Sequence, residues 1–207
     1  CVLADLAADS CINAAQLPSA ARRADRHQKL RPALSSASTT RQPAVGRIDA
    51  QPQPGGMNPI VHPAAPLVRG DAAATVAPSS ALETDQHLLE GLAVLRDWGL
   101  EPLHQNVAGR CWGYLAGRDT ERHADLEQRA PLLACARGGW GAARLLEQPM
   151  AWSEGWLLGF SDITALLWAR LAAGYDGNVH GPLLTTLASE PPWSRERLRR
   201  LLFGEPL

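Results

Sequence analysis

The stretch "GFSDITALLWA" (residues 159–169) joins two kinds of apolar pattern. The residues that lead into it, "EGWLLGF" (154–160), form a short, continuous apolar run that is typical of a buried strand. The residues that follow, "ITALLWARLAAG" (163–174), have apolar side chains at helical spacing and end in a glycine, which is typical of a helix. Ser161 therefore lies at a predicted strand-to-helix turn, where a rigid scaffold can expose a hydroxyl.

The same alternation of strand and helix patterns recurs along the chain from about Pro66 onward. Further strands are predicted at 72–78, 101–108, 131–136 and 177–182. Helices are predicted within 79–100, 118–130 and 142–148, the first of them capped by Ser79 or Ser80 and ending near Gly99. This alternation predicts an α/β fold, with an open, mostly parallel sheet flanked by helices.

Right-handed crossovers place every strand-to-helix turn at one edge of such a sheet, where ligands bind. "VAPSS" (76–80), "ARGGWG" (136–141) and "GFSD" (159–162) each follow a strand, so we expect them to converge on one crevice. Ser161 there resembles a nucleophile elbow, in which the amide of Asp162 would face an oxyanion. The alternative is that Ser161 simply caps the helix, which is what serine does most often at such positions. "GFSD" also lacks the second glycine of the GxSxG motif.

The glycine-rich turn "RGGWG" (137–141) can offer backbone amides to an anion. It has neither the GxGxxG pattern nor the Gly-Lys-Ser/Thr of a phosphate-binding loop, so the alternative is a tight turn with Trp140 shielding the crevice. His180 ends a predicted strand and is the histidine best placed to reach the crevice, although a structural role is favoured over a catalytic one.

The bulk composition excludes several classes of partner. The formal net charge is −1, so neither nucleic acid nor an anionic membrane surface is expected as a partner, since either would favour a basic patch. No apolar run approaches the ~20 residues that span a bilayer, and no signal peptide is visible, so the default location is cytoplasmic. The sequence has no CxxC pair and no histidine–carboxylate spacing of a metal site, so we expect neither a metal nor a cofactor.

The first quarter of the chain has a different composition. Residues 1–56 contain no Phe, Trp or Tyr and are rich in Ala, Ser, Arg, Gln and Pro. Such a segment cannot offset the entropy of ordering itself by burying apolar surface. We therefore expect a disordered or non-native extension over 1–63, with Met57 as a candidate true start, and an α/β domain over 64–207.

Five motifs together resemble one family. They are "VRGDAAATVAPSS" (68–80), "GYLAGRDTERHADLEQ" (113–128), "CARGGWGAARLLE" (135–147), "GFSDITALL" (159–167) and "HGP" (180–182). In this order and approximate spacing they resemble the N-terminal half of the LD-carboxypeptidases, the serine peptidases that include murein tetrapeptide carboxypeptidases and microcin-immunity peptidases. The resemblance covers roughly residues 64 to 206.

The resemblance implies a serine hydrolase that removes a terminal D-amino acid from an L,D-peptide bond. In the cell-wall members the substrate is a murein tetrapeptide, which is processed in the cytoplasm without a metal, and subunits of the family often pair as homodimers. By matching positions, Ser161 is the nucleophile. The backbone amides of Asp162 and of either Gly138 or Gly139 form the oxyanion hole.

The chain departs from the family pattern after "LLFGEPL" (201–207). The resemblance implies a general-base histidine and a glutamate partner in a C-terminal domain that follows this point, and we expect that domain to be absent here. A serine without a base is a poor nucleophile. We therefore expect an incomplete fragment that is inactive by itself. One alternative is a non-catalytic peptide-binding or interaction module. A self-contained hydrolase that uses His180 is disfavoured, because no acidic partner for it is evident.

Overall fold

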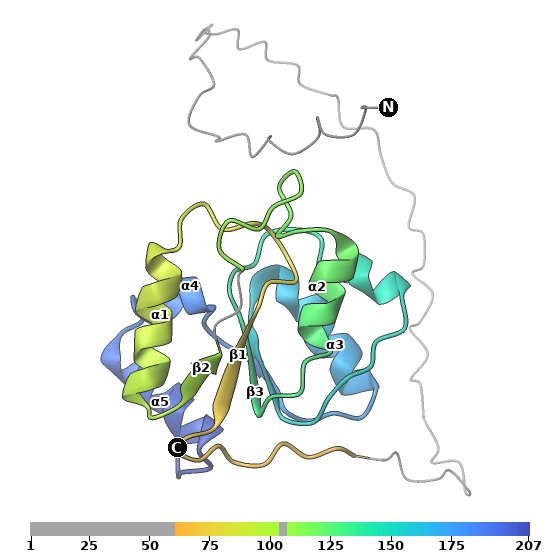
Figure 1. Ribbon diagram of the computed structural model, residues 1–207. Helices are drawn as coiled ribbons and strands as arrows, with labels where there is room; N and C mark the ends of the chain where they lie inside the picture. Colours follow the sequence, from red (N-terminus) through yellow and green to blue (C-terminus); the bar gives the residue numbers. More distant parts are fainter. Residues whose placement is uncertain (1–60, 104–106) are drawn as a thin grey trace, which may run out of the picture. The chain divides into compact units, whose positions relative to one another are not determined.

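The computed structural model describes residues 61–103 and 107–207, built around a sheet of five strands in the order β2-β1-β3-β4-β5 (Figure 1). Every pairing within it is parallel. The strands are β1 (Ala72–Val76), β2 (Glu101–Leu103), β3 (Leu132–Cys135), β4 (Trp156–Gly159) and β5 (Asn178–His180). The predicted open parallel sheet is thus confirmed, and each of its strands falls inside a stretch that the sequence marks as a strand.

Helices connect the strands and cover both faces of the sheet. They are α1 (Gln86–Asp97), α2 (Asp119–Leu126), α3 (Thr164–Ala172), α4 (Leu184–Leu187) and α5 (Pro192–Leu202), with 3-10 turns at Ala143–Glu147 and Ser161–Ile163. Figure 1 shows α1, α4 and α5 on one side of the sheet and α2 and α3 on the other. None of the helices in the described ranges has the length and apolar composition needed to cross a bilayer.

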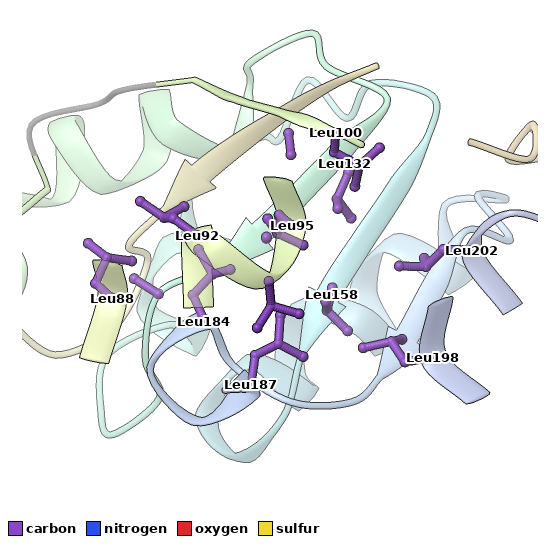
Figure 2. Close-up of a cluster of buried hydrophobic side chains, with 14 of the residues drawn as sticks. Leu88, Leu92, Leu95, Leu100, Leu132, Leu158, Leu184, Leu187, Leu198 and Leu202 are labelled. Atoms are coloured by element: carbon purple, nitrogen blue, oxygen red, sulfur yellow. The ribbon is translucent and has the colours of Figure 1, made fainter. Parts of the chain in front are cut away.

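The two faces of the sheet bury separate apolar clusters, because successive side chains of a strand point to opposite faces. In β3, Leu132 and Ala134 belong to the cluster under α1, α4 and α5, whereas Leu133 and Cys135 belong to the cluster under α2 and α3. Figure 2 shows leucines of the first cluster, which come from helices on that face, from β3 and β4, and, for Leu100, from the residue before β2. Strands buried on both faces explain why the sequence reads as continuous apolar runs rather than alternating ones.

One helix boundary differs from the sequence-based expectation. Helix α1 begins at Gln86, after Asp85 at its N-cap, rather than after Ser79 or Ser80. The hydroxyls of these two serines are engaged elsewhere, with Asp162 and Trp140. Gly99 does follow the end of α1, with a φ of +86° that glycine adopts readily.

The described residues begin inside the segment that the sequence assigns to the N-terminal extension. The amide of His62 donates to the carbonyl of Gly174 at 2.8 Å, and the His62 ring stacks on Tyr175 with centroids 4.4 Å apart. Residues 61–63 are thus held against the sheet-bearing body. The rest of the predicted extension lies outside the described residues, and the domain division remains a prediction.

The strand order creates a natural place for a site. From β1 the chain moves to β2 on one side, whereas from β3 it continues to β4 and β5 on the other. Connections that leave neighbouring strands in opposite directions open a crevice at the carboxyl ends of those strands. By this rule the place for a ligand is at the carboxyl ends of β1 and β3, next to the end of β4.

Candidate active site

Ser161 stands at the sharpest turn of this edge. Strand β4 ends at Gly159, Phe160 is extended, and Ser161 then has a φ of 64°. Among the described residues it is the only non-glycine with a positive φ. Its side chain is exposed although the preceding strand is buried. The backbone therefore reverses at Ser161 and lifts its hydroxyl above the sheet, as at a nucleophile elbow.

The capping alternative for Ser161 is not what the structure shows. Phe160 is the N-cap of the 3-10 turn Ser161–Ile163, and Ile163 is the N-cap of α3. Neither cap has a side-chain hydrogen bond, and Ser161 lies inside the turn rather than before it. Its hydroxyl is therefore not used to complete the helix.

The glycine-rich turn after β3 lies directly beside Ser161, as predicted. A Cβ placed on Gly138 would be 3.0 Å from the Cβ and 3.1 Å from the Oγ of Ser161, so the Gly138 backbone abuts the hydroxyl. Gly139 has a φ of +121°, and a Cβ there would overlap the Oγ of Ser80. Gly139 thus requires a residue without a side chain, Gly138 leaves little room for one, and the turn brings its backbone close to Ser161.

The carboxylate of Asp162 fastens the surrounding turns to one another. Its Oδ2 accepts a hydrogen bond from Ser79 Oγ at 2.6 Å and another from the backbone amide of Ala142 at 2.8 Å. Ser79 is fully buried and follows β1, whereas Ala142 follows the glycine-rich turn. From the sequence, only the amide of Asp162 was assigned a role, and the role of its side chain was missed.

The backbone of Trp140 is hydrogen-bonded, whereas its side chain is exposed to solvent. Its amide donates to Ser80 Oγ at 3.1 Å, and its carbonyl lies 3.2 Å from Ser79 Oγ. The indole is 75% exposed, so it contributes apolar surface next to the glycine turn rather than to the core.

The buried guanidinium of Arg122 binds the turns that follow β1 and β3. Arg122 on α2 is fully buried and donates to the carbonyls of Pro78 (2.7 Å) and Gly141 (3.0 Å). Its other terminal nitrogen donates to Asp119 Oδ1 at 2.5 Å. The guanidinium thereby joins the turn after β1 to the turn after β3. The sequence marks α2 as a charged helix and gives no signal that this residue points inward.

The structure places His180 on the neighbouring strand but does not pair it with the serine. His180 ends β5 in register with Gly159, is exposed, and meets the Phe160 ring edge-on with centroids 6.2 Å apart. Within residues 61–103 and 107–207, no histidine hydrogen-bonds to Ser161 Oγ. The same ranges contain no group of three or more His, Cys, Asp or Glu side chains arranged to hold a metal ion.

A large hollow among the described residues lies elsewhere. It has a volume of about 790 Å³ and is lined at the amino ends of β1, β3 and β4 by residues such as Asp71, Pro131 and Gly155. The serine, the glycine turn and the converging amides are all at the opposite edge. We therefore place the candidate site by its chemistry rather than by the size of the hollow.

A comparison with known families agrees with this geometry. The profile of the LD-carboxypeptidase N-terminal domain matches residues 73–181, more than half of the chain, and this range contains all of β1 but its first residue, the glycine turn and Ser161. The chain belongs to the LD-carboxypeptidase family. The resemblance that the five sequence motifs indicated is thereby confirmed.

Curated relatives cover the same region. A Synechocystis sp. protein whose name provisionally assigns it to the carboxypeptidases is 43% identical over 150 residues, which cover 69% of this chain and 50% of the relative. A Streptomyces coelicolor protein with a name of the same kind is 35% identical over 162 residues, covering 72% of this chain and 52% of the relative. The chain thus spans about half the length of the curated relatives it matches.

Solved structures show the same fold at lower identity. MccF in complex with glutamyl sulfamoyl guanosine superimposes with a TM-score of 0.58 at 23% identity, over 67% of this chain and 46% of that one. An MccF-like protein from Bacillus anthracis gives a TM-score of 0.57 at 16% identity, over 68% and 46%. At these identities the likeness concerns the fold alone, and it again spans about half of the longer chains.

Proposed function

We propose that this chain carries the nucleophile-bearing half of the active site of a serine LD-carboxypeptidase. Its reaction would be hydrolysis of an L,D-peptide bond that releases the terminal D-alanine of a murein tetrapeptide in the cytoplasm. The observation that carries the proposal is the exposed Ser161 in a left-handed backbone conformation at the end of β4, with the Gly138 backbone against its hydroxyl. Membership of the family supports the reaction class.

The proposed roles follow from the positions of the groups. Ser161 Oγ attacks the scissile carbonyl carbon, and the carbonyl oxygen becomes an oxyanion. The amide of Asp162 and that of Gly138 or Gly139 donate hydrogen bonds to it, the kind of stabilisation that often supplies the largest single term in acyl transfer. The D-alanine amine leaves with a proton, and water then hydrolyses the acyl-serine.

The reaction also requires a base that takes the proton from Ser161. Among the described residues none is hydrogen-bonded to that hydroxyl, and general-base assistance is typically worth about 10²–10⁴-fold in rate. We propose that the base comes from the half of the family's proteins that this chain does not match, since the curated relatives are about twice as long as the matched region.

Supplying that region provides the test. The chain would be fused to the carboxyl-terminal half of the Synechocystis relative, and D-alanine release from murein tetrapeptide would be followed by chromatography. We expect release by the fusion, little or none by the 207-residue chain alone, and none by the fusion with Ser161→Ala. If the fusion kept its rate after Ser161→Ala, the nucleophile assignment would be wrong.

A non-catalytic peptide-binding module is the second candidate. It is favoured by the lack of a histidine bonded to Ser161 in the described part of the chain. Calorimetric titration with murein tetrapeptide, taken together with the fusion assay, distinguishes the two candidates. A binding module binds the peptide, but the fusion made from it releases no D-alanine. Two MccF structures hold an acidic amino acid joined by a sulfamoyl group to a nucleoside, so such a conjugate is the natural second ligand.

A further inference from the structure

One oxygen atom of Asp162 joins three turns that come from distant parts of the chain. Ser79, 83 positions away, and Ala142, 20 positions away, both donate to Oδ2 of this side chain. The turns that it joins follow β1, β3 and β4. Hydrogen bonds to a charged acceptor are shorter and roughly twice as strong as neutral ones, so this is the strongest kind of polar link available between the turns.

The link fixes the distance between the groups that the proposed reaction needs. The two oxyanion-hole amides belong to different turns, one with Ser161 after β4 and the other with Gly138 or Gly139 after β3. The Gly138 backbone already lies close to Ser161 Oγ. A shift of a few tenths of an ångström between these turns would therefore misalign the hydroxyl or the amides.

We propose that the Asp162 side chain, held by Ser79, is a positioning residue that sets the register of the nucleophile turn against the glycine turn. This role rests on the proposed function and is separate from that of the Asp162 amide. The carboxylate touches no substrate atom. It acts through Ala142 on the glycine turn and through its own backbone on Ser161.

The test measures the reactivity of Ser161 in the full 207-residue chain. A fluorophosphonate probe forms a bond from phosphorus to Ser161 Oγ and releases fluoride, and at pH 9 hydroxide takes the proton that a missing base would accept. Intact-mass spectrometry at several probe concentrations gives the maximal labelling rate and the probe affinity separately. Circular dichroism shows at which temperature all variants are folded.

We expect Asp162→Ala to lower the maximal labelling rate by about 10–100-fold, less than the about 10²–10³-fold found when one oxyanion donor is removed outright, with little change in probe affinity. Asp162→Asn keeps an acceptor oxygen and should recover most of the rate. Ser79→Ala should lower the rate, and adding it to Asp162→Ala should lower it no further, since both act through one contact. The matched control is Asp71→Ala, which removes a carboxylate that accepts from the Val68 amide at the other edge of the sheet.

The outcomes separate the two proposals. Labelling that persists after Ser161→Ala would overturn the proposed function. If Ser161→Ala abolishes labelling but Asp162→Ala labels within twofold of the unchanged chain, only the positioning role is wrong.

A second measurement needs no reactivity. Amide hydrogen exchange at Gly138, Gly139 and Ala142 should be at least 10-fold faster in Asp162→Ala than in Asp71→Ala. Equal exchange in these two variants would overturn the positioning role even if the chain proves unreactive. If Asp162→Ala does not fold, Ser79→Ala takes its place, and unchanged exchange and labelling in Ser79→Ala would overturn the positioning role.

Discussion

The left-handed backbone of Ser161 carries a conformational cost that the rest of the fold must offset. A non-glycine residue in this region is less stable by about 1–2 kcal/mol than in the right-handed one, whereas glycine has no such penalty. Ser161→Gly should therefore unfold at a higher urea concentration, with a gain of about 1 kcal/mol, although it removes the hydroxyl. Ser161→Ala keeps the strain and should show no such gain, so equal stabilities of the two variants would contradict the strained geometry.

Gly138 tests the contact with the serine without changing the serine. Its φ is not in the left-handed region, so alanine fits the backbone, but the added methyl would lie about 3 Å from Ser161 Cβ and Oγ. Gly138→Ala should therefore keep the fold and lower fluorophosphonate labelling of Ser161. Gly70→Ala is the control, because Gly70 has a φ of +91° and open space around it, so the change strains the backbone far from the site. Unchanged labelling of Gly138→Ala would show that the glycine turn lies farther from Ser161.

The candidate site divides into residues that sequence can reveal and residues that it cannot. Ser161, Gly138 and Gly139 lie at turns that follow apolar runs, and this local pattern is enough to place them. Asp162 and Ser79 are joined across 83 positions, so no local pattern predicts their contact. The same holds for Arg122, whose position on a charged helix reads as exposed until the turns that it supports are in place.

At the level of the elements, the buried strands were the easiest to predict and the helix ends were the hardest. Strands β3 and β4 are uninterrupted apolar runs and β1 is interrupted only by Thr75, as expected of strands in a sheet covered on both faces. Helix α1 starts late because its expected caps, Ser79 and Ser80, form tertiary hydrogen bonds instead. Helix α5 was not predicted, because its buried residues, Leu198 and Leu202, stand among mostly charged and exposed ones. Only the packing of these two leucines on the core reveals its role.

The link between α2 and the two turns gives a prediction at this scale. Arg122→Met removes a fully buried cation and leaves the carbonyls of Pro78 and Gly141 without their donor, so it should lower the free energy of unfolding by about 2–5 kcal/mol. Arg144 also pairs with Asp119, but its side chain is 52% exposed, so Arg144→Met should change stability by less than about 1 kcal/mol. Urea unfolding of both variants provides the measurement. Equal losses would mean that Arg122 contributes no more than a surface ion pair.

At the scale of the whole molecule, Cys135 makes stability depend on pH. Burial between the sheet and the α2–α3 layer, and secondarily the Asp125 carboxylate, raise the pKa of the Cys135 thiol far above its ordinary value of 9.0. The folded chain therefore keeps a proton that the unfolded chain releases above pH 9, and this contribution, fully present below pH 9, is lost as the pH rises. The loss is about 1.4 kcal/mol per pH unit.

Comparison with Cys135→Ala isolates this effect from all other titrating groups. The stability difference between the two proteins, from urea unfolding under reducing conditions, should be constant from pH 7 to pH 8.5. Above pH 8.5 the unchanged chain should lose stability steadily relative to Cys135→Ala, up to pH 11. A difference that stays flat over the whole range would show that the thiol is not buried in the folded state.

The all-parallel sheet also constrains how the chain can be made. Thr75 of β1 pairs with Ala134 of β3, so a central strand is synthesised long before its neighbour exists. At the usual ~5–20 residues per second of translation, the roughly 60 intervening residues take about 3–12 s to emerge. During that interval β1 is exposed on the ribosome without one of its partners. Its sequence, "AAATV", has few large apolar side chains, so the waiting strand offers little surface to a neighbouring nascent chain.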